Sequence, residues 1–196
     1  MAKKELMEAV KAYYDSQGWH YRYKTEKDTI EMIIGVNAMS SCRVVTKVKN
    51  DRFSTYCIFP PRVPEEKRAA VGEYLHRAND GLDIGNFEMN YENGEIRYKA
   101  NIFCGDQIPD MEIIERLVDV GMDMFDRLSS GILKVMYADK NPKEALELSK
   151  VSSLLESLER VGMQSGNEDM LGQIRGLRAK MSGESGEDEE EQEEEE

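Results

Sequence analysis

The sequence predicts an α+β fold built on an antiparallel sheet. Three observations lead to this prediction: helical spacing of apolar residues at the start of the chain, a group of alternating strand-like segments after it, and a long amphipathic segment that begins at Pro109. The connections between the strand-like segments are short. Short connections favour antiparallel pairing, because parallel strands need a crossover of a dozen residues or more.

Apolar periodicity gives the first helix and the strands that follow it. Residues 4–17 carry apolar side chains at helical spacing, and Gly18 is suited to end the helix. The strand-like segments after it are residues 19–24, 29–36, 42–49 and 52–59. The second of these, TIEMIIGV, is almost continuously apolar and is expected to be a buried strand. The following PPRVP ends the group, since proline cannot donate to a ladder.

A helix, a tight reversal and a hairpin come next. The helix opens at Pro64, and Gly81 can take the left-handed conformation that ends it. Gly85 allows the chain to reverse without a side-chain clash. Asn93 and Gly94 then form the strongest short hairpin signal, between two alternating strands. The order is therefore helix, β-meander, helix, β-hairpin and a long C-terminal helix whose broad apolar stripe is suited to cover one face of the sheet.

The chain is expected to divide into three parts. These are an α+β domain over residues 1–137, a helical extension over residues 138–181 and a disordered acidic tail over residues 182–196. In the extension, NPKE at residues 141–144 begins a helix, and a break at residues 162–166 precedes a last short one.

The extension also carries the residues expected to bind a partner or a second copy. They lie at heptad a and d spacing over about two heptads, too few to establish a coiled coil: Leu148, Val151, Leu155 and Leu158. Either this stripe pairs between chains, or it folds back within the chain together with Ile174 and Leu177. A homodimer is the expected state.

The charge of the chain is concentrated at its end. The segment from Glu184 to Glu196 holds ten acidic residues and no basic one, which leaves the rest with 29 acidic and 26 basic residues. Because the sequence shows no basic stripe, we do not expect nucleic-acid binding. No apolar run approaches the roughly 20 residues that span a bilayer, and the N-terminus lacks an apolar signal core, so no membrane association is expected.

The acidic tail is expected to add nothing to stability. It has almost no apolar side chain to bury, and its charges repel one another. Truncation after Lys180 should therefore leave the fold intact, with thermal melts of the two forms agreeing within a few degrees. A large loss in the truncated form would show that the tail docks.

No catalytic, cofactor-binding or metal-binding residues are identified. His20 and His76 stand alone, and the sequence has no HExxH, GxSxG, Walker A or GxGxxG pattern. Asp119 and Asp123, at i and i+4, could approach one metal, but with Asp126 they are expected to form a solvated helix face.

The three cysteines, Cys42, Cys57 and Cys104, lack CxxC spacing and are expected to be reduced core thiols, which indicates the cytoplasm.

The middle of the sequence resembles the YbjN-type domains, which are described as bacterial sensory transduction regulators. The resemblance rests on the helix ending in RAN, the glycine kink with GNFEMN and the strand GEIRYK. It covers roughly residues 4–133. It implies a fold similar to that of type III secretion chaperones, small domains that commonly dimerise and bind proteins. The family has no established catalytic residues, so none is carried over.

These observations favour a non-enzymatic adaptor, chaperone-like or regulatory module that binds a protein client or regulator through its sheet or an exposed helix. The alternative is a regulatory domain that senses a small ligand in a pocket between the sheet and the long helix. A third, weaker alternative is an enzyme whose carboxylates the sequence does not reveal. Exposed apolar area on the sheet favours the adaptor, and a closed pocket with converging polar groups favours the sensor.

Overall fold

The structure, a computed structural model, describes residues 3–36 and 39–182. The predicted acidic tail therefore lies outside the described residues, apart from its first position. The helices and strands are α1 (Lys3–Ser16), β1 (Arg22–Lys24), the 3-10 turn η1 (Thr25–Lys27), β2 (Thr29–Val36), β3 (Met39–Val48), β4 (Arg52–Ile58), the 3-10 turn η2 (Glu65–Lys67), α2 (Arg68–Asn79), β5 (Asn86–Asn90), β6 (Glu95–Phe103), α3 (Met111–Tyr137), α4 (Pro142–Ser165) and α5 (Glu168–Ser182).

The chain divides into two compact units, with the boundary between Ser149 and Lys150. The start of α4 therefore belongs to the first unit, where Ala145 and Leu146 join the core. Ser149 is fully buried there, and its hydroxyl donates to the carbonyl oxygen of Ala145 at 2.9 Å.

The six strands form one antiparallel sheet in the order β1-β2-β3-β4-β6-β5. Strands β1 to β4 are a meander, and the β5–β6 hairpin joins it through β6, which pairs with β4. This arrangement confirms the predicted α+β fold. The first strand is shorter than predicted: only Arg22–Lys24 pairs with β2. The preceding Trp19 instead packs edge-on against Tyr13 and Tyr14 of α1, since this large ring buries more apolar area there.

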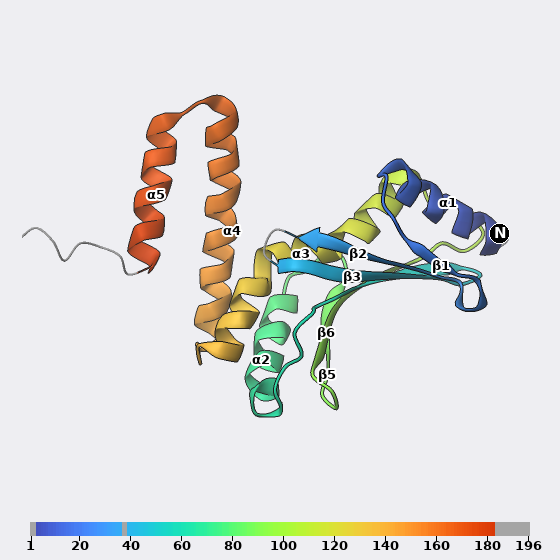
Figure 1. The fold of residues 1–196 in the computed structure, drawn as a ribbon, viewed down its shortest axis with the longest axis horizontal. Coiled ribbons are helices and arrows are strands. Elements are labelled where there is room, and N and C mark those ends of the chain that lie inside the picture. The colour runs from blue at the N-terminus through green and yellow to red at the C-terminus, as the bar shows by residue number, and fades with distance from the viewer. Residues whose placement is uncertain (1–2, 37–38, 183–196) are drawn as a thin grey trace, which may run out of the picture. The chain divides into compact units, whose positions relative to one another are not determined.

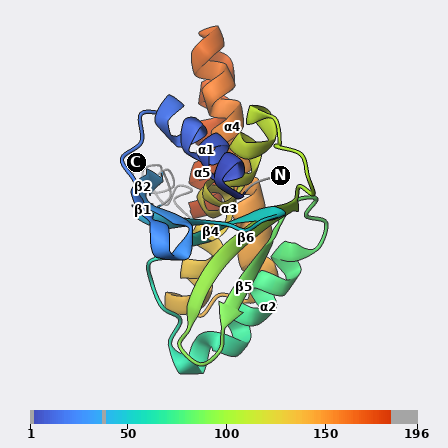
Figure 2. The same cartoon turned by 90° about the vertical axis from the view of Figure 1, so that its right-hand side faces the viewer.

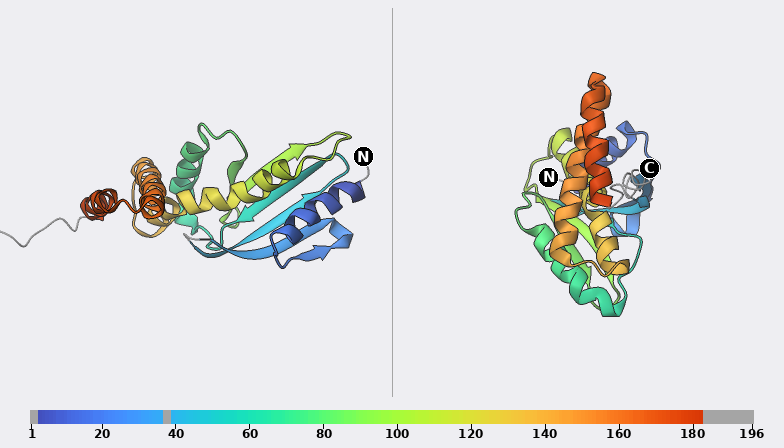
Figure 3. Two further views of the ribbon diagram at one scale, coloured as in Figure 1. Left: turned by 90° about the horizontal axis from the view of Figure 1, so that it is seen from above. Right: turned by 90° about the vertical axis from the view of Figure 1, so that its left-hand side faces the viewer.

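Helices α1 and α3 cover one face of the sheet, and α2 packs beside β5 and α3 (Figures 1 and 2). Viewed from above, α1 and α3 lie over the strands (Figure 3). An aromatic cluster fills the space beneath α3: Phe125 stacks on Phe59 and meets Phe87 edge-on, both at 5.4 Å between ring centroids. At Gly121, α3 comes so close to β4 that an added Cβ would lie 2.7 Å from the Cβ of Cys57.

The side chain of Asn79, at the end of α2, binds the edge strand β5 with two hydrogen bonds like those between paired strands. The Asn79 amide donates to the carbonyl oxygen of Phe87 at 3.0 Å and accepts from its backbone N–H at 2.7 Å. This pair satisfies backbone groups that an edge strand otherwise leaves open. Asn79 closes the RAN segment of the sequence, so this bond gives a physical reason for that residue.

Aspartates on α3 are not all solvated, contrary to the sequence prediction. Asp119 is half-buried and accepts a hydrogen bond from the Tyr13 hydroxyl on α1, at 2.8 and 2.9 Å to its two oxygens. The pKa of Asp119 is raised, because burial and the nearby charges of Asp123 and Glu115 outweigh the hydrogen bond from Tyr13. The prediction failed because α1, far away in sequence, covers this part of α3.

The raised pKa of Asp119 gives a pH dependence with a definite sign. The folded state holds the proton more tightly than the unfolded state, so the contribution of Asp119 to stability is present below about pH 4 and is lost as pH rises through the folded pKa. We expect Asp119→Asn, which keeps an acceptor for Tyr13, to gain stability relative to wild type as pH rises from about 4 to 7. Urea melts across that range measure the difference. A constant difference would contradict the burial effect.

Helix α4 runs through the segment where the sequence predicted a break. It continues past Gly162 to Ser165, and the chain turns at Gly166, which has a φ of 66°. Gly162 has a packing role: an added Cβ would lie 2.9 Å from Leu171 of α5. Together with an ion pair between Glu159 and Arg178 at 2.9 Å, this close contact joins the two helices side by side (Figure 1).

Candidate protein-binding face

One face of the sheet is left uncovered by the helices. Its outward side chains alternate with the core side chains along each strand. We call this surface the open face and define it by Ile33, Arg43, Val45, Lys47, Tyr56, Ile58, Arg97 and Lys99.

The strand register lines up these side chains in rows across the sheet. One row runs Ile33, Arg43, Ile58, Arg97 and Glu88 from β2 to β5. The neighbouring row runs Glu31, Val45, Tyr56, Lys99 and Asn86. Because side chains in such rows are about 4.5–5.5 Å apart, apolar and charged groups adjoin one another across the sheet, and neighbouring side chains largely cover Val45.

The apolar part of the open face includes a large exposed residue. Ile33 is 75% exposed, and Ile58 and Tyr56 are partly exposed beside it. The sequence prediction of a buried strand at residues 29–36 was therefore wrong for its outward positions. An unbroken apolar run does not reveal which of its residues face solvent.

The open face is also basic, although the whole chain is acidic. Glu88 pairs with Arg97 at 2.6 Å and with Lys99 at 3.3 Å. The pKa of Glu88 is lowered: burial opposes the shift, but the hydrogen bonds and charges of these two bases outweigh it. In the described part of the chain, neither Arg43 nor Lys47 forms a close ion pair, although the charge of Arg43 contributes to lowering the pKa of Glu31. The Lys47 ammonium lies 5.2 Å from the Tyr56 ring centroid.

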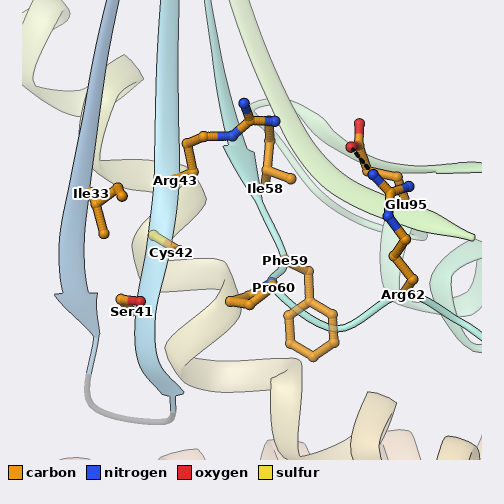
Figure 4. A pocket seen from close by; sticks show the side chains of 9 residues that line it. All are labelled: Ile33, Ser41, Cys42, Arg43, Ile58, Phe59, Pro60, Arg62 and Glu95. Atoms are coloured by element: carbon orange, nitrogen blue, oxygen red, sulfur yellow. Dashed lines mark hydrogen bonds and ion pairs between the residues drawn. The ribbon is translucent and has the colours of Figure 1, made fainter. Parts of the chain in front are cut away.

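A hollow of about 220 Å³ lies at one end of the open face (Figure 4). β4 ends at Ile58, opposite Arg43, whereas β3 begins earlier, at Met39. The first residues of β3 therefore have no β4 residue beside them, and the hollow forms in this gap. Arg62 pairs there with Glu95 at 3.3 Å. The lining residues are Ile33, Ser41, Cys42, Arg43, Ile58, Phe59, Pro60, Arg62 and Glu95. Since Pro60 cannot extend the ladder, the β3 backbone at Ser41 faces this gap on the side away from β2.

The predicted partner-binding stripe is divided by the structure. Leu148 is half-buried and Leu155 is buried, whereas Val151 and Leu158 are exposed. Four of the exposed apolar residues of α4 form a different row, which we call the α4 row: Val151, Leu154, Leu158 and Val161. These positions also follow heptad spacing. The predicted stripe and the α4 row share Val151 and Leu158, and both follow heptad spacing. The sequence alone therefore did not show that Leu154 and Val161 are the exposed members.

The predicted turn residues lie at reversals of the chain. Gly81 follows α2 with a φ of 80°, and Gly85 precedes β5 with a φ of 77°. The hairpin connection is longer than the two-residue turn that Asn93 and Gly94 suggested. Residues 91–94 form the loop, Gly94 has a φ of 70°, and Asn93 does not have a positive φ. Instead, the Asn93 side chain accepts from the N–H of Glu95 at 2.9 Å.

The two histidines that the sequence singled out lie apart in the described ranges. His20 and His76 are both exposed, on different elements. Among residues 3–36 and 39–182, no group of three or more His, Cys, Asp or Glu side chains could hold a metal ion. Within the same ranges, no helix has the length and apolar character needed to cross a bilayer.

Comparison with known families identifies the domain that carries the open face. A family model described as "Putative bacterial sensory transduction regulator" matches residues 7–134. The chain belongs to the YbjN family. This confirms the resemblance seen in the sequence, and the matched residues run from α1 to α3 of the YbjN domain. The family description is regulatory and names no reaction. No curated protein sequence matches the chain.

Two solved structures are similar to this one. A YbjN protein from E. coli, titled "a putative transcription regulator", has 10% sequence identity and a TM-score of 0.45, covering 67% of this chain and 89% of its own. A chain of the heterodimeric ExoU-SpcU complex from the type III secretion system of Pseudomonas aeruginosa has 13% identity and a TM-score of 0.43, covering 65% and 97%.

Proposed function

We propose that this YbjN domain is a non-enzymatic, regulatory or chaperone-like module that binds a partner protein on the open face. The observation that carries the proposal is the combination of exposed Ile33 with Arg43 and Lys47, two bases that form no close ion pair in the described residues. Ile33 adjoins other apolar side chains of the open face, and apolar patches with a polar rim mark protein-binding sites more often than single exposed residues do.

The arrangement of the core favours this function over the sensing of a small ligand. A small-ligand sensor would need a pocket between the sheet and α3. That space instead holds the closely packed rings of Phe59, Phe87 and Phe125. The hollow at Cys42 opens instead on the end of the open face.

The charges indicate the chemistry of the partner. Arg43 and Lys47 attract carboxylates, while Ile33 and Ile58 on either side of Arg43, and Tyr56 in the neighbouring row, offer apolar contact. A segment with apolar side chains flanked by aspartate or glutamate complements both features. The free thiols of the domain fit the reducing cytoplasm, where we place the protein.

A pair of matched variants tests the open face. Ile33→Asp with Arg43→Glu reverses its apolar and basic character. Ile108→Asp with Lys143→Glu makes the same changes at exposed positions away from it. Proteins captured from native lysate by the wild type and by the control, but lost with the open-face variant, are candidate partners. With the purified partner, calorimetry should show at least about a tenfold loss of affinity. Equal binding by both variants would refute the proposal.

We also propose that the chain self-associates through the α4 row. Four exposed apolar side chains at heptad spacing form a face that is complementary to a second copy of itself. The buried residues Leu155, Leu171 and Ile174 lie outside this row and belong to the interior of the chain.

A further inference from the structure

Two cysteines on adjacent strands lie in contact, although they are 15 positions apart in the sequence. Cys42 of β3 and Cys57 of β4 both point to the helix-covered side of the sheet, and each is only 1% exposed. Their sulfur atoms are 3.1 Å apart. A disulfide bond is about 2.05 Å long, so the two atoms need to approach by roughly 1 Å.

The N-terminal part of β3, which contains Cys42, can move toward β4. In the ladder, Cys57 is opposite Val44, and the last pair between β3 and β4 joins Arg43 to Ile58. Cys42 lies one residue beyond that pair and is held by the ladder only on the β2 side, opposite Ile34. A shift of Cys42 toward β4 therefore breaks no hydrogen bond between β3 and β4.

The two thiols differ in their surroundings. Cys57 donates its S–H to Cys42 and packs against α3 at Gly121. The pKa of the Cys42 thiol is lowered because it accepts this hydrogen bond, and the pKa of Cys57 is raised by the same bond and by burial. Cys42 lines the hollow shown in Figure 4, and Cys57 does not. The small exposed area of Cys42 restricts access to a small oxidant.

We propose that Cys42 and Cys57 are a peroxide-sensitive thiol pair that forms an intramolecular disulfide between β3 and β4. The Cys42 thiolate attacks one oxygen of hydrogen peroxide, which breaks the O–O bond, gives a sulfenic acid and releases hydroxide. The Cys57 sulfur then attacks the Cys42 sulfur and displaces the hydroxyl, and the lost protons complete two water molecules. Two thiols are oxidised and one peroxide is reduced. The inference is independent of the partner that binds the open face.

Thiol counting on the full chain tests the proposal. The reduced protein is treated with hydrogen peroxide, quenched with catalase, denatured and alkylated. We expect two of the three thiols to be lost, a peptide containing Cys42 linked to one containing Cys57, and full recovery with dithiothreitol. Peptide mapping is needed because the twelve methionines also take up oxygen. A second arm uses Cys57→Ser, in which dimedone should label Cys42 as a trapped sulfenic acid.

Cys104 is the internal control. It is more exposed than the pair and has no thiol partner in the described structure. Three alkylatable thiols after treatment, or a bridge that includes Cys104, would overturn the proposal. If Cys57→Ser fails to fold, the linked peptide from the wild-type protein still decides the question.

Discussion

Replacement of Gly85 by alanine should lower the free energy of unfolding by about 2–5 kcal/mol. Two costs add at this position. The φ of 77° is unfavourable for any residue with a Cβ, and the new methyl would lie 2.6 Å from the carbonyl oxygen of Lys99 and from the ring of Tyr98. The Tyr98 ring has little freedom to move away, because its hydroxyl donates to the carbonyl oxygen of Ile84.

Gly81→Ala is the matched control for Gly85→Ala. Gly81 has nearly the same φ, 80°, but nothing lies within 4 Å of its added Cβ. It should therefore show only the backbone cost, about 1–2 kcal/mol. The difference between the two variants in urea or guanidinium melts isolates the contact with β6. Equal losses at both sites would show that this contact is easily relieved.

Other residues at position 85 separate the two costs further. Asparagine tolerates positive φ, so Gly85→Asn removes most of the backbone penalty but keeps the Cβ that meets Lys99. We expect it to be milder than alanine and still clearly destabilised. Valine should be the most harmful. If all three variants unfold at the wild-type midpoint, the kink before β5 does not require glycine.

Lysine at two neighbouring positions of α4 should have opposite effects. Leu154 is 59% exposed and belongs to the α4 row, whereas Leu155 is 5% exposed. Leu154→Lys places a charge in the proposed seam between two copies, so it should convert a dimer into a folded monomer. Leu155→Lys places a charge among buried apolar atoms and should lower stability by about 3 kcal/mol or more without changing the mass.

Sedimentation equilibrium at micromolar concentration, with denaturant melts beside it, distinguishes these outcomes. A wild-type mass of 22.4 kDa at every concentration would refute self-association. Dissociation by Leu155→Lys and not by Leu154→Lys would instead place the stripe predicted from the sequence, which contains Leu155, at the interface.

Local features of the sequence determined most of the elements. Periodicity of 3.6 or 2 located the helices and strands, and glycines marked positions where the backbone requires a positive φ, as at Gly81 and Gly85. The family signature was also local, since it consists of one helix, one kink and one strand. These features depend on neighbours within a few residues, so the sequence contains them directly.

The tertiary structure alone decided which surfaces face solvent and which distant groups meet. Pairing of β4 with β6 has no local signal, yet it places Arg97 beside Ile58 and Lys99 beside Tyr56 on the open face. The contact between Cys42 and Cys57 follows from the register of β3 with β4, and the burial of Asp119 follows from where α1 packs. Each depends on contacts between residues far apart in the chain. The free energy of such contacts is gained only when the whole domain packs. Periodicity describes one element at a time and contains no information about such contacts.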